Sequence, residues 1–132
     1  MTVAEDGTLY FGVTDLASIK CRLYALKPDG TLKWATSDIE NALYGTPTVD
    51  TNGNVYFGVG YFTGTGEGGV TIDGALYKLE SDGEVAWTFT DSGNMDPLYT
   101  SPIIDSNGYV YFGTGANSVD TLAVGDVYSI TE

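Results

Sequence analysis

One ten-residue pattern occurs twice in this chain, and it restricts the possible folds more than any other feature. Val49 to Gly58 reads VDTNGNVYFG and Ile104 to Gly113 reads IDSNGYVYFG, while a shorter version, AEDGTLYFG, runs from Ala4 to Gly12. Self-similarity along the whole length indicates a repeat architecture in which each unit stacks on the next.

A second pattern alternates with the first and gives the period. It reads LYALKPDGTLKW from Leu23 to Trp34, LYKLESDGEVAW from Leu76 to Trp87, and VYSITE from Val127 to Glu132. The two tryptophans are 53 residues apart, so the unit has about 50 residues.

The recurring glycines Gly12, Gly58 and Gly113 are separated by 46 and 55 residues, so the length varies only in a few segments. We predict that these segments are loops and that the three glycines are structural. Trp34 and Trp87 recur in phase, and we predict that they pack between neighbouring units.

Each full unit holds four runs rich in Val, Leu, Tyr, Phe and Trp, bounded by Asp-Gly, Asn-Gly and Pro, as is typical of a four-stranded antiparallel meander. In the second unit the predicted strands are Thr46–Asp50, Asn54–Gly60, Ala75–Glu80 and Glu84–Phe89. No helical pattern is present. The second strand is almost continuously apolar, which indicates that both sheet faces are covered. The predicted fold class is all-β, with sheets arranged as β-propeller blades.

These motifs resemble the repeat of pyrroloquinoline-quinone-type (PQQ-type) propellers, a family of quinoprotein dehydrogenases and of a scaffolding lipoprotein without a cofactor. TPTVDTNGNVYFG and SPIIDSNGYVYFG are similar to that family's first hairpin, and LYALKPDGTLKW and LYKLESDGEVAW to its second. The turns depart from the family pattern, because Pro28-Asp29-Gly30 and Ser81-Asp82-Gly83 replace its Thr-Gly ahead of the tryptophan. The resemblance implies a propeller and an extracellular, periplasmic or cell-surface location.

We expect three blades, at about residues 2–36, 46–90 and 101–132, the last lacking its outer strand. Propellers close with typically 4–8 blades, so an arc of three leaves apolar blade faces exposed. We therefore expect the ring to close by self-association or through further blades of a longer chain.

Composition narrows the function. The net charge is −13, which repels phosphate backbones and anionic lipid heads, and no segment is long and apolar enough for a membrane span. Neither nucleic acid nor a membrane is an expected partner. The chain has no histidine, the usual general base, and its single cysteine, Cys21, forms no internal disulfide. We predict a non-enzymatic module without a cofactor.

The blades of a propeller form a disk, and the loops that vary in length between the repeats are expected on one face of it. This face is the expected binding surface. The segments that connect one blade to the next, here called crossovers, repeat the motifs LYGTP and LYTSP. These motifs place Tyr44 and Tyr99 where the chain turns toward the first strand of the next blade. The long loop Tyr61–Gly74 carries Tyr61 and Phe62. These four aromatics are the candidate ligand-binding residues, either for a sugar or as packing between blades.

Two alternatives concern ions and phosphates. Asp50, Asn52, Asp105 and Asn107 offer oxygen ligands for calcium, but each loop supplies only two such side chains, and Asn-Gly suits a hairpin turn with positive φ. A turn is the favoured interpretation. Gly64, Gly66 and Gly69 match the spacing of a phosphate-binding loop, but no helix follows to bind the phosphate.

Three function classes stay open at this point. The preferred one is a protein-interaction or adhesion scaffold, motivated by the repeats and the absence of a nucleophile constellation. The second is a sugar-binding propeller that uses the loop aromatics. The third is a piece of a quinoprotein dehydrogenase whose cofactor site lies elsewhere in the ring.

Overall fold

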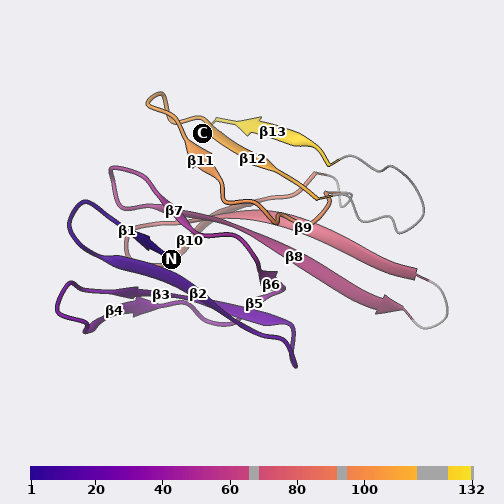
Figure 1. Cartoon of the computed structure of the whole chain (residues 1–132), viewed down its shortest axis with the longest axis horizontal. Helices are drawn as coiled ribbons and strands as arrows, with labels where there is room; N and C mark the ends of the chain where they lie inside the picture. The colour runs from indigo at the N-terminus through magenta and orange to yellow at the C-terminus, as the bar shows by residue number, and fades with distance from the viewer. Residues whose placement is uncertain (66–68, 92–94, 116–124, 132) are drawn as a thin grey trace.

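The computed structural model describes residues 1–65, 69–91, 95–115 and 125–131, with the backbone alone described for 61–65 and 69–73. These residues form three antiparallel sheets and no helix (Figure 1). The predicted all-β fold class is confirmed. Within the same ranges no helix is long and apolar enough to cross a membrane.

Each sheet follows the chain order of its strands. Sheet 1 consists of β1 (Thr2–Val3), β2 (Leu9–Asp15), β3 (Lys20–Leu26) and β4 (Leu32–Ala35), with β5 (Ile39–Glu40) beside β3. Sheet 2 consists of β7 (Thr48–Val49), β8 (Val55–Thr65), β9 (Gly69–Leu79) and β10 (Val85–Phe89), with β6 (Ala42–Leu43) beside β8. Sheet 3 consists of β11 (Ile103–Ile104), β12 (Val110–Gly113) and β13 (Val127–Ile130).

The segment Tyr61–Gly74, predicted as a loop, belongs largely to two long strands. β8 and β9 continue their pairing from Gly60↔Gly74 to Thr65↔Gly69 (Figure 1). The prediction was wrong because glycine content suggested a loop, whereas the β-branched and aromatic residues between the glycines pair as strands. The crossover 35–45 also contains two short strands, β5 and β6, that were not predicted.

One face of every sheet, here called the Phe–Tyr face, carries a phenylalanine stacked on a tyrosine of the neighbouring strand. The ring centroids are 5.4, 5.3 and 5.1 Å apart in sheets 1, 2 and 3. The pairs are Phe11–Tyr24, Phe57–Tyr77 and Phe112–Tyr128.

The opposite face, here called the glycine face, carries a repeated glycine paired with an apolar residue across the strands. These pairs are Gly12↔Leu23, Gly58↔Leu76 and Gly113↔Val127. Because side chains alternate between the two faces of a strand, the in-phase repeats give all three sheets the same two faces.

The core lies between successive sheets. Phe57 and Val59, on the Phe–Tyr face of sheet 2, share one cluster with Tyr10 and Leu23, on the glycine face of sheet 1. The next interface repeats this arrangement, because Phe112 of sheet 3 clusters with Leu76 of sheet 2. Each contact therefore joins a Phe–Tyr face to a glycine face.

The glycines make room for leucines of the crossovers. A Cβ added at Gly58 would lie 2.3 Å from the Cβ of Leu98, and one added at Gly12 would lie 2.8 Å from a terminal methyl of Leu43. At Gly113 the nearest atom would be 3.7 Å away, on Thr100. The three repeated glycines are therefore crowded by their neighbours to different degrees.

We expect Gly58→Ala to lower the free energy of unfolding by about 1–3 kcal/mol, because its methyl group would overlap the buried Leu98 side chain. Gly113→Ala is the matched control and should change stability by less than about 0.5 kcal/mol. Gly12→Ala should fall between them, because the Leu43 methyl can rotate away. Urea denaturation measures all three, and equal losses at Gly58 and Gly113 would contradict this packing.

Candidate functional site

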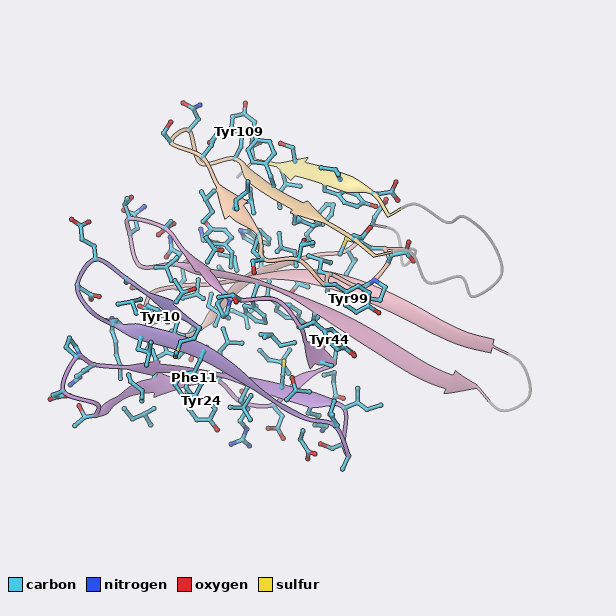
Figure 2. All side chains as sticks on the ribbon, in the orientation of Figure 1. Tyr10, Phe11, Tyr24, Tyr44, Tyr99 and Tyr109 are labelled. Atoms are coloured by element: carbon cyan, nitrogen blue, oxygen red, sulfur yellow. The ribbon has the colours of Figure 1, made fainter. Side chains whose placement is uncertain are left out.

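The Phe–Tyr face of sheet 1 is uncovered in the structure. Phe11 and Tyr24 point away from sheets 2 and 3, whereas Tyr10 points toward them (Figure 2). Val13 lies on this uncovered face and is 51% exposed, whereas Val59, its in-phase counterpart, is 0% exposed. The same strand pattern is therefore buried between sheets 1 and 2 and open to solvent on sheet 1.

More apolar side chains extend this open face to both edges of sheet 1. Val3 pairs with Leu9 across β1 and β2, and Leu32 pairs with Leu26 across β3 and β4. Val3 and Leu32 are both exposed, and Leu9 and Leu26 are half-buried. This apolar surface ends at Val13, which lies opposite Arg22 of the Arg22–Asp38 ion pair. An exposed apolar surface bordered by charged residues is typical of a protein contact site.

The tryptophan of β4 contacts the turn of the next sheet. Trp34 Nε1 donates a hydrogen bond of 2.9 Å to the carbonyl oxygen of Ser81, and its ring lies against Gly83, where an added Cβ would be 2.8 Å away. The register of β3 and β4 shifts just before Trp34, and that of β9 and β10 shifts in the same way before Trp87. Bulges of this kind redirect a side chain. Trp87 packs against the cluster between sheets 2 and 3.

The five short hairpins have turns of the same type. In the hairpin between β7 and β8, the N–H of Gly53 donates to the carbonyl oxygen of Asp50, and the N–H of Asp50 donates to that of Asn54. Gly53 has a φ of 84°, a left-handed conformation that glycine adopts without steric cost. Asn52 keeps a negative φ, because Ile19 and Asn41 are the non-glycine residues with positive φ in the described ranges. The turn therefore needs glycine at one position only.

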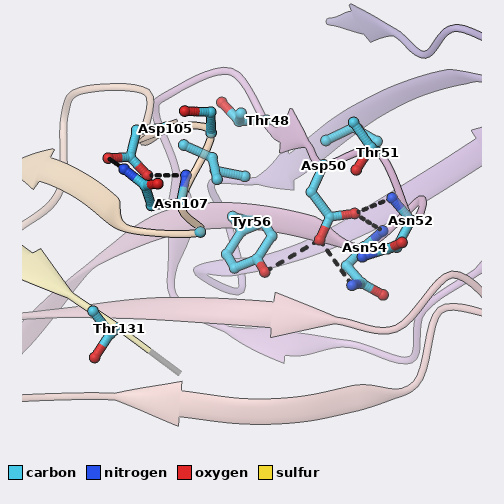
Figure 3. A pocket seen from close by; sticks show the side chains of 13 residues that line it. Thr48, Asp50, Thr51, Asn52, Asn54, Tyr56, Asp105, Asn107 and Thr131 are labelled. Atoms are coloured by element: carbon cyan, nitrogen blue, oxygen red, sulfur yellow. Dashed lines mark hydrogen bonds between the residues drawn. The ribbon is translucent and has the colours of Figure 1, made fainter.

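The carboxylate of Asp50 is occupied by its own turn. It accepts hydrogen bonds from the N–H groups of Asn52 and Asn54, from the Asn54 amide and, at 3.4 Å, from the Tyr56 hydroxyl (Figure 3). Its oxygens therefore support the hairpin interpretation over the calcium interpretation.

Asp105 repeats this arrangement in sheet 3. It accepts from the N–H groups of Asn107 and Tyr109 at 2.8 and 2.9 Å and from the Tyr111 hydroxyl at 3.4 Å. The N–H of Tyr109 first, and then Asn107, hold the pKa of this carboxyl below its ordinary value of 3.8. In the described ranges no group of three or more Cys, Asp and Glu side chains is arranged to hold a metal ion.

A groove of about 740 Å³ separates the Asp50 turn from the Asp105 turn (Figure 3). Thr48, Tyr56 and Thr131 also line it. The groove lies on the short-turn face, where the repeated motifs gave no sign of a cavity, because it forms only when two sheets stand side by side.

The turn hydrogen bonds predict a pH dependence. A carboxyl whose pKa is lower in the folded than in the unfolded chain adds stability above its unfolded pKa, and this stability is lost as the pH falls through the folded pKa. The free energy of unfolding should therefore decrease as the pH falls below about 4, and Asp105→Asn should make this decrease smaller. Tyr111→Phe, which keeps both backbone hydrogen bonds to Asp105, should retain most of the decrease in the free energy of unfolding. Urea denaturation at a series of pH values measures the effect, and identical pH profiles for Asp105→Asn and the parent chain would contradict it.

Tyr44 and Tyr99 are brought together from two crossovers 55 residues apart in the sequence (Figure 2). Their ring centroids are 5.0 Å apart in an edge-to-face arrangement, and their side chains are 44% and 41% exposed. Tyr44 lies over Gly60, and Tyr99 lies over Gly115. Burial first, and then Tyr44 and Asp96, raise the pKa of Tyr99, so its hydroxyl stays protonated at neutral pH. The pair presents two half-exposed rings and two phenol hydroxyls.

The side chains of the other two candidates, Tyr61 and Phe62, lie outside the described residues, although their backbone belongs to β8. Gly64 and Gly69 of the phosphate-type spacing also fall within β8 and β9, and Gly66 is not described. Cys21 is buried, which raises the pKa of its thiol to about 11 and keeps it protonated.

No family model matches the chain, and no curated protein matches it. The similarity of the two hairpin motifs to PQQ-type repeats is therefore a hypothesis that rests on the motifs alone.

Proposed function

We propose that this chain is a non-enzymatic β-propeller module of PQQ-like type that acts as a protein-interaction scaffold. Each of its sheets is a blade, and the Phe–Tyr face of sheet 1 is the surface on which a protein partner docks. The observation that carries the proposal is the contrast between Val13, which is half exposed, and its fully buried counterpart Val59.

The internal interfaces support a blade-like partner. The stacked pairs Phe57–Tyr77 and Phe112–Tyr128 each lie against the glycine face of the preceding sheet. The equivalent pair of sheet 1, Phe11–Tyr24, has the same geometry without that cover. Burying each large apolar side chain contributes about 1.5–3 kcal/mol, so a matching face gains stability by covering it. The partner is thus a protein surface shaped like a glycine face, supplied by another chain or by further blades.

A tandem chain tests this proposal. Two copies joined by a flexible linker hold the glycine face of one sheet 3 near the Phe–Tyr face of the following sheet 1 at a millimolar effective concentration. We expect the tandem chain to melt roughly 5 °C or more above the single chain. Calorimetry or circular dichroism measures the difference.

Val13→Glu in both copies should abolish this gain, because it places a carboxylate in the covered interface. Leu16→Glu in both copies is the matched control, since Leu16 is also exposed but lies between β2 and β3. A tandem chain that melts at the temperature of the single chain would contradict the proposed docking face.

A second candidate function, sugar binding, is favoured by the Tyr44–Tyr99 pair. Half-exposed aromatic rings offer flat apolar surfaces for a sugar ring, and the protonated phenol of Tyr99 can donate a hydrogen bond to a hydroxyl. The two rings come from neighbouring crossovers, so the ligand would bind across sheets 2 and 3.

For this candidate we expect hits on a glycan array that Tyr44→Ala and Tyr99→Ala each weaken at least about tenfold. Tyr109→Ala is the control, because Tyr109 is exposed to a similar degree, 40%, but lies in the Asp105 turn. Absence of hits with the parent chain would exclude the sugar-binding candidate without affecting the scaffold.

A further inference from the structure

The chain has two uncovered faces of opposite type. The first is the Phe–Tyr face of sheet 1. The second is the glycine face of sheet 3, where Val127 is 84% exposed although its in-phase counterparts, Leu23 and Leu76, are 0% exposed. Ile103 on the same face is 64% exposed.

The glycine face of sheet 3 has the features that the internal glycine faces use for docking. Tyr111 pairs with Ile103 as Tyr10 pairs with Thr2, and the nearest atom of the described residues to a Cβ added at Gly113 lies 3.7 Å away.

The glycine face of sheet 3 differs in one feature from the glycine faces of sheets 1 and 2. At the internal interfaces the hydroxyls of Thr2 and Thr48 donate to the carbonyl oxygens of Pro47 and Pro102 of the next sheet. Sheet 3 has Ile103 at this position, so its uncovered face is more apolar. Such a surface is suited to a partner that brings apolar side chains.

We propose that the Phe–Tyr face of sheet 1 in one chain docks on the glycine face of sheet 3 in a second copy of this chain. The inference rests on the proposed function, and it names the partner. The two internal interfaces show which surface a Phe–Tyr face takes, since both pair it with a glycine face. The contact is therefore head to tail.

Head-to-tail contacts form a ring if the rotation closes and a filament if it does not. Two copies bring six sheets, which lies within the number of blades found in closed propellers. Both uncovered faces of each copy are then covered. Because each chain has a net charge of −13, the copies repel at long range, and added salt should strengthen the association.

The experiment measures the mass of the chain by size-exclusion chromatography with light scattering. The parent chain should have twice its 14.0 kDa mass. Val13→Glu on sheet 1 and Val127→Glu on sheet 3 should each raise the dissociation constant by about 100-fold or more, because either one places a charged side chain between the two docking faces. Leu16→Glu, which adds the same charge at an exposed turn, should remain a dimer.

Mixing the two disrupted variants tests the direction of the contact. Val13→Glu keeps its glycine face on sheet 3, and Val127→Glu keeps its Phe–Tyr face on sheet 1, so an equimolar mixture should form a heterodimer through one intact interface. Circular dichroism verifies that both variants stay folded; both sites are exposed in the single chain.

Three results would overturn the inference. A parent chain that stays at 14.0 kDa excludes the second copy as the partner, and the tandem chain then tests the proposed docking face separately. A dimer broken by Val13→Glu but not by Val127→Glu would show that two Phe–Tyr faces meet each other. A mixture that stays monomeric at the highest soluble concentration would exclude the head-to-tail contact.

Discussion

Every part of this structure depends on the need to cover both faces of each sheet. The strands place a phenylalanine–tyrosine stack on one face and a glycine with a leucine or valine on the other. Both faces are largely apolar, so a single sheet exposes apolar surface on both sides and gains stability by stacking. The complementary shapes of the two faces make the stacking directional, and this direction determines which surfaces stay open at sheets 1 and 3.

The short hairpins fix the register of this stacking. In each of them a glycine with positive φ closes the turn, and in sheets 2 and 3 an aspartate side chain accepts the turn's free N–H groups. A one-residue slip would exchange the two faces of a strand, so these turns keep the Phe–Tyr stack and the glycine on their proper sides. The same hydrogen bonds occupy the oxygens that would otherwise be available to a cation. Polar residues that recur with the repeat therefore maintain the fold, and the proposed docking uses residues that the repeat leaves uncovered.

The fold class and most strand positions followed from the sequence because short apolar runs between Asp-Gly and Asn-Gly turns have few alternatives. The extension of β8 and β9 through Tyr61–Gly74 did not follow. In that segment local composition favoured a loop, and pairing across the two strands outweighed it. The candidate site was predicted only in part. Tyr44 and Tyr99 were singled out separately by their motifs, but their edge-to-face contact comes from two crossovers meeting in space. The groove between the Asp50 and Asp105 turns has no sequence signal, since its walls belong to different sheets.

The sequence by itself determined the repeat, the all-β class, the turns and the two faces of each strand, because these depend on side-chain alternation and on local backbone preferences. Tertiary structure decided which face meets which. Val13 and Val59 occupy the same position in two repeat units, and the sequence alone does not distinguish their burial. In the structure Val13 is half exposed and Val59 is fully buried. The physical reason is that burial depends on the neighbouring sheet, and position along the stack is a property of the assembled structure rather than of any one repeat.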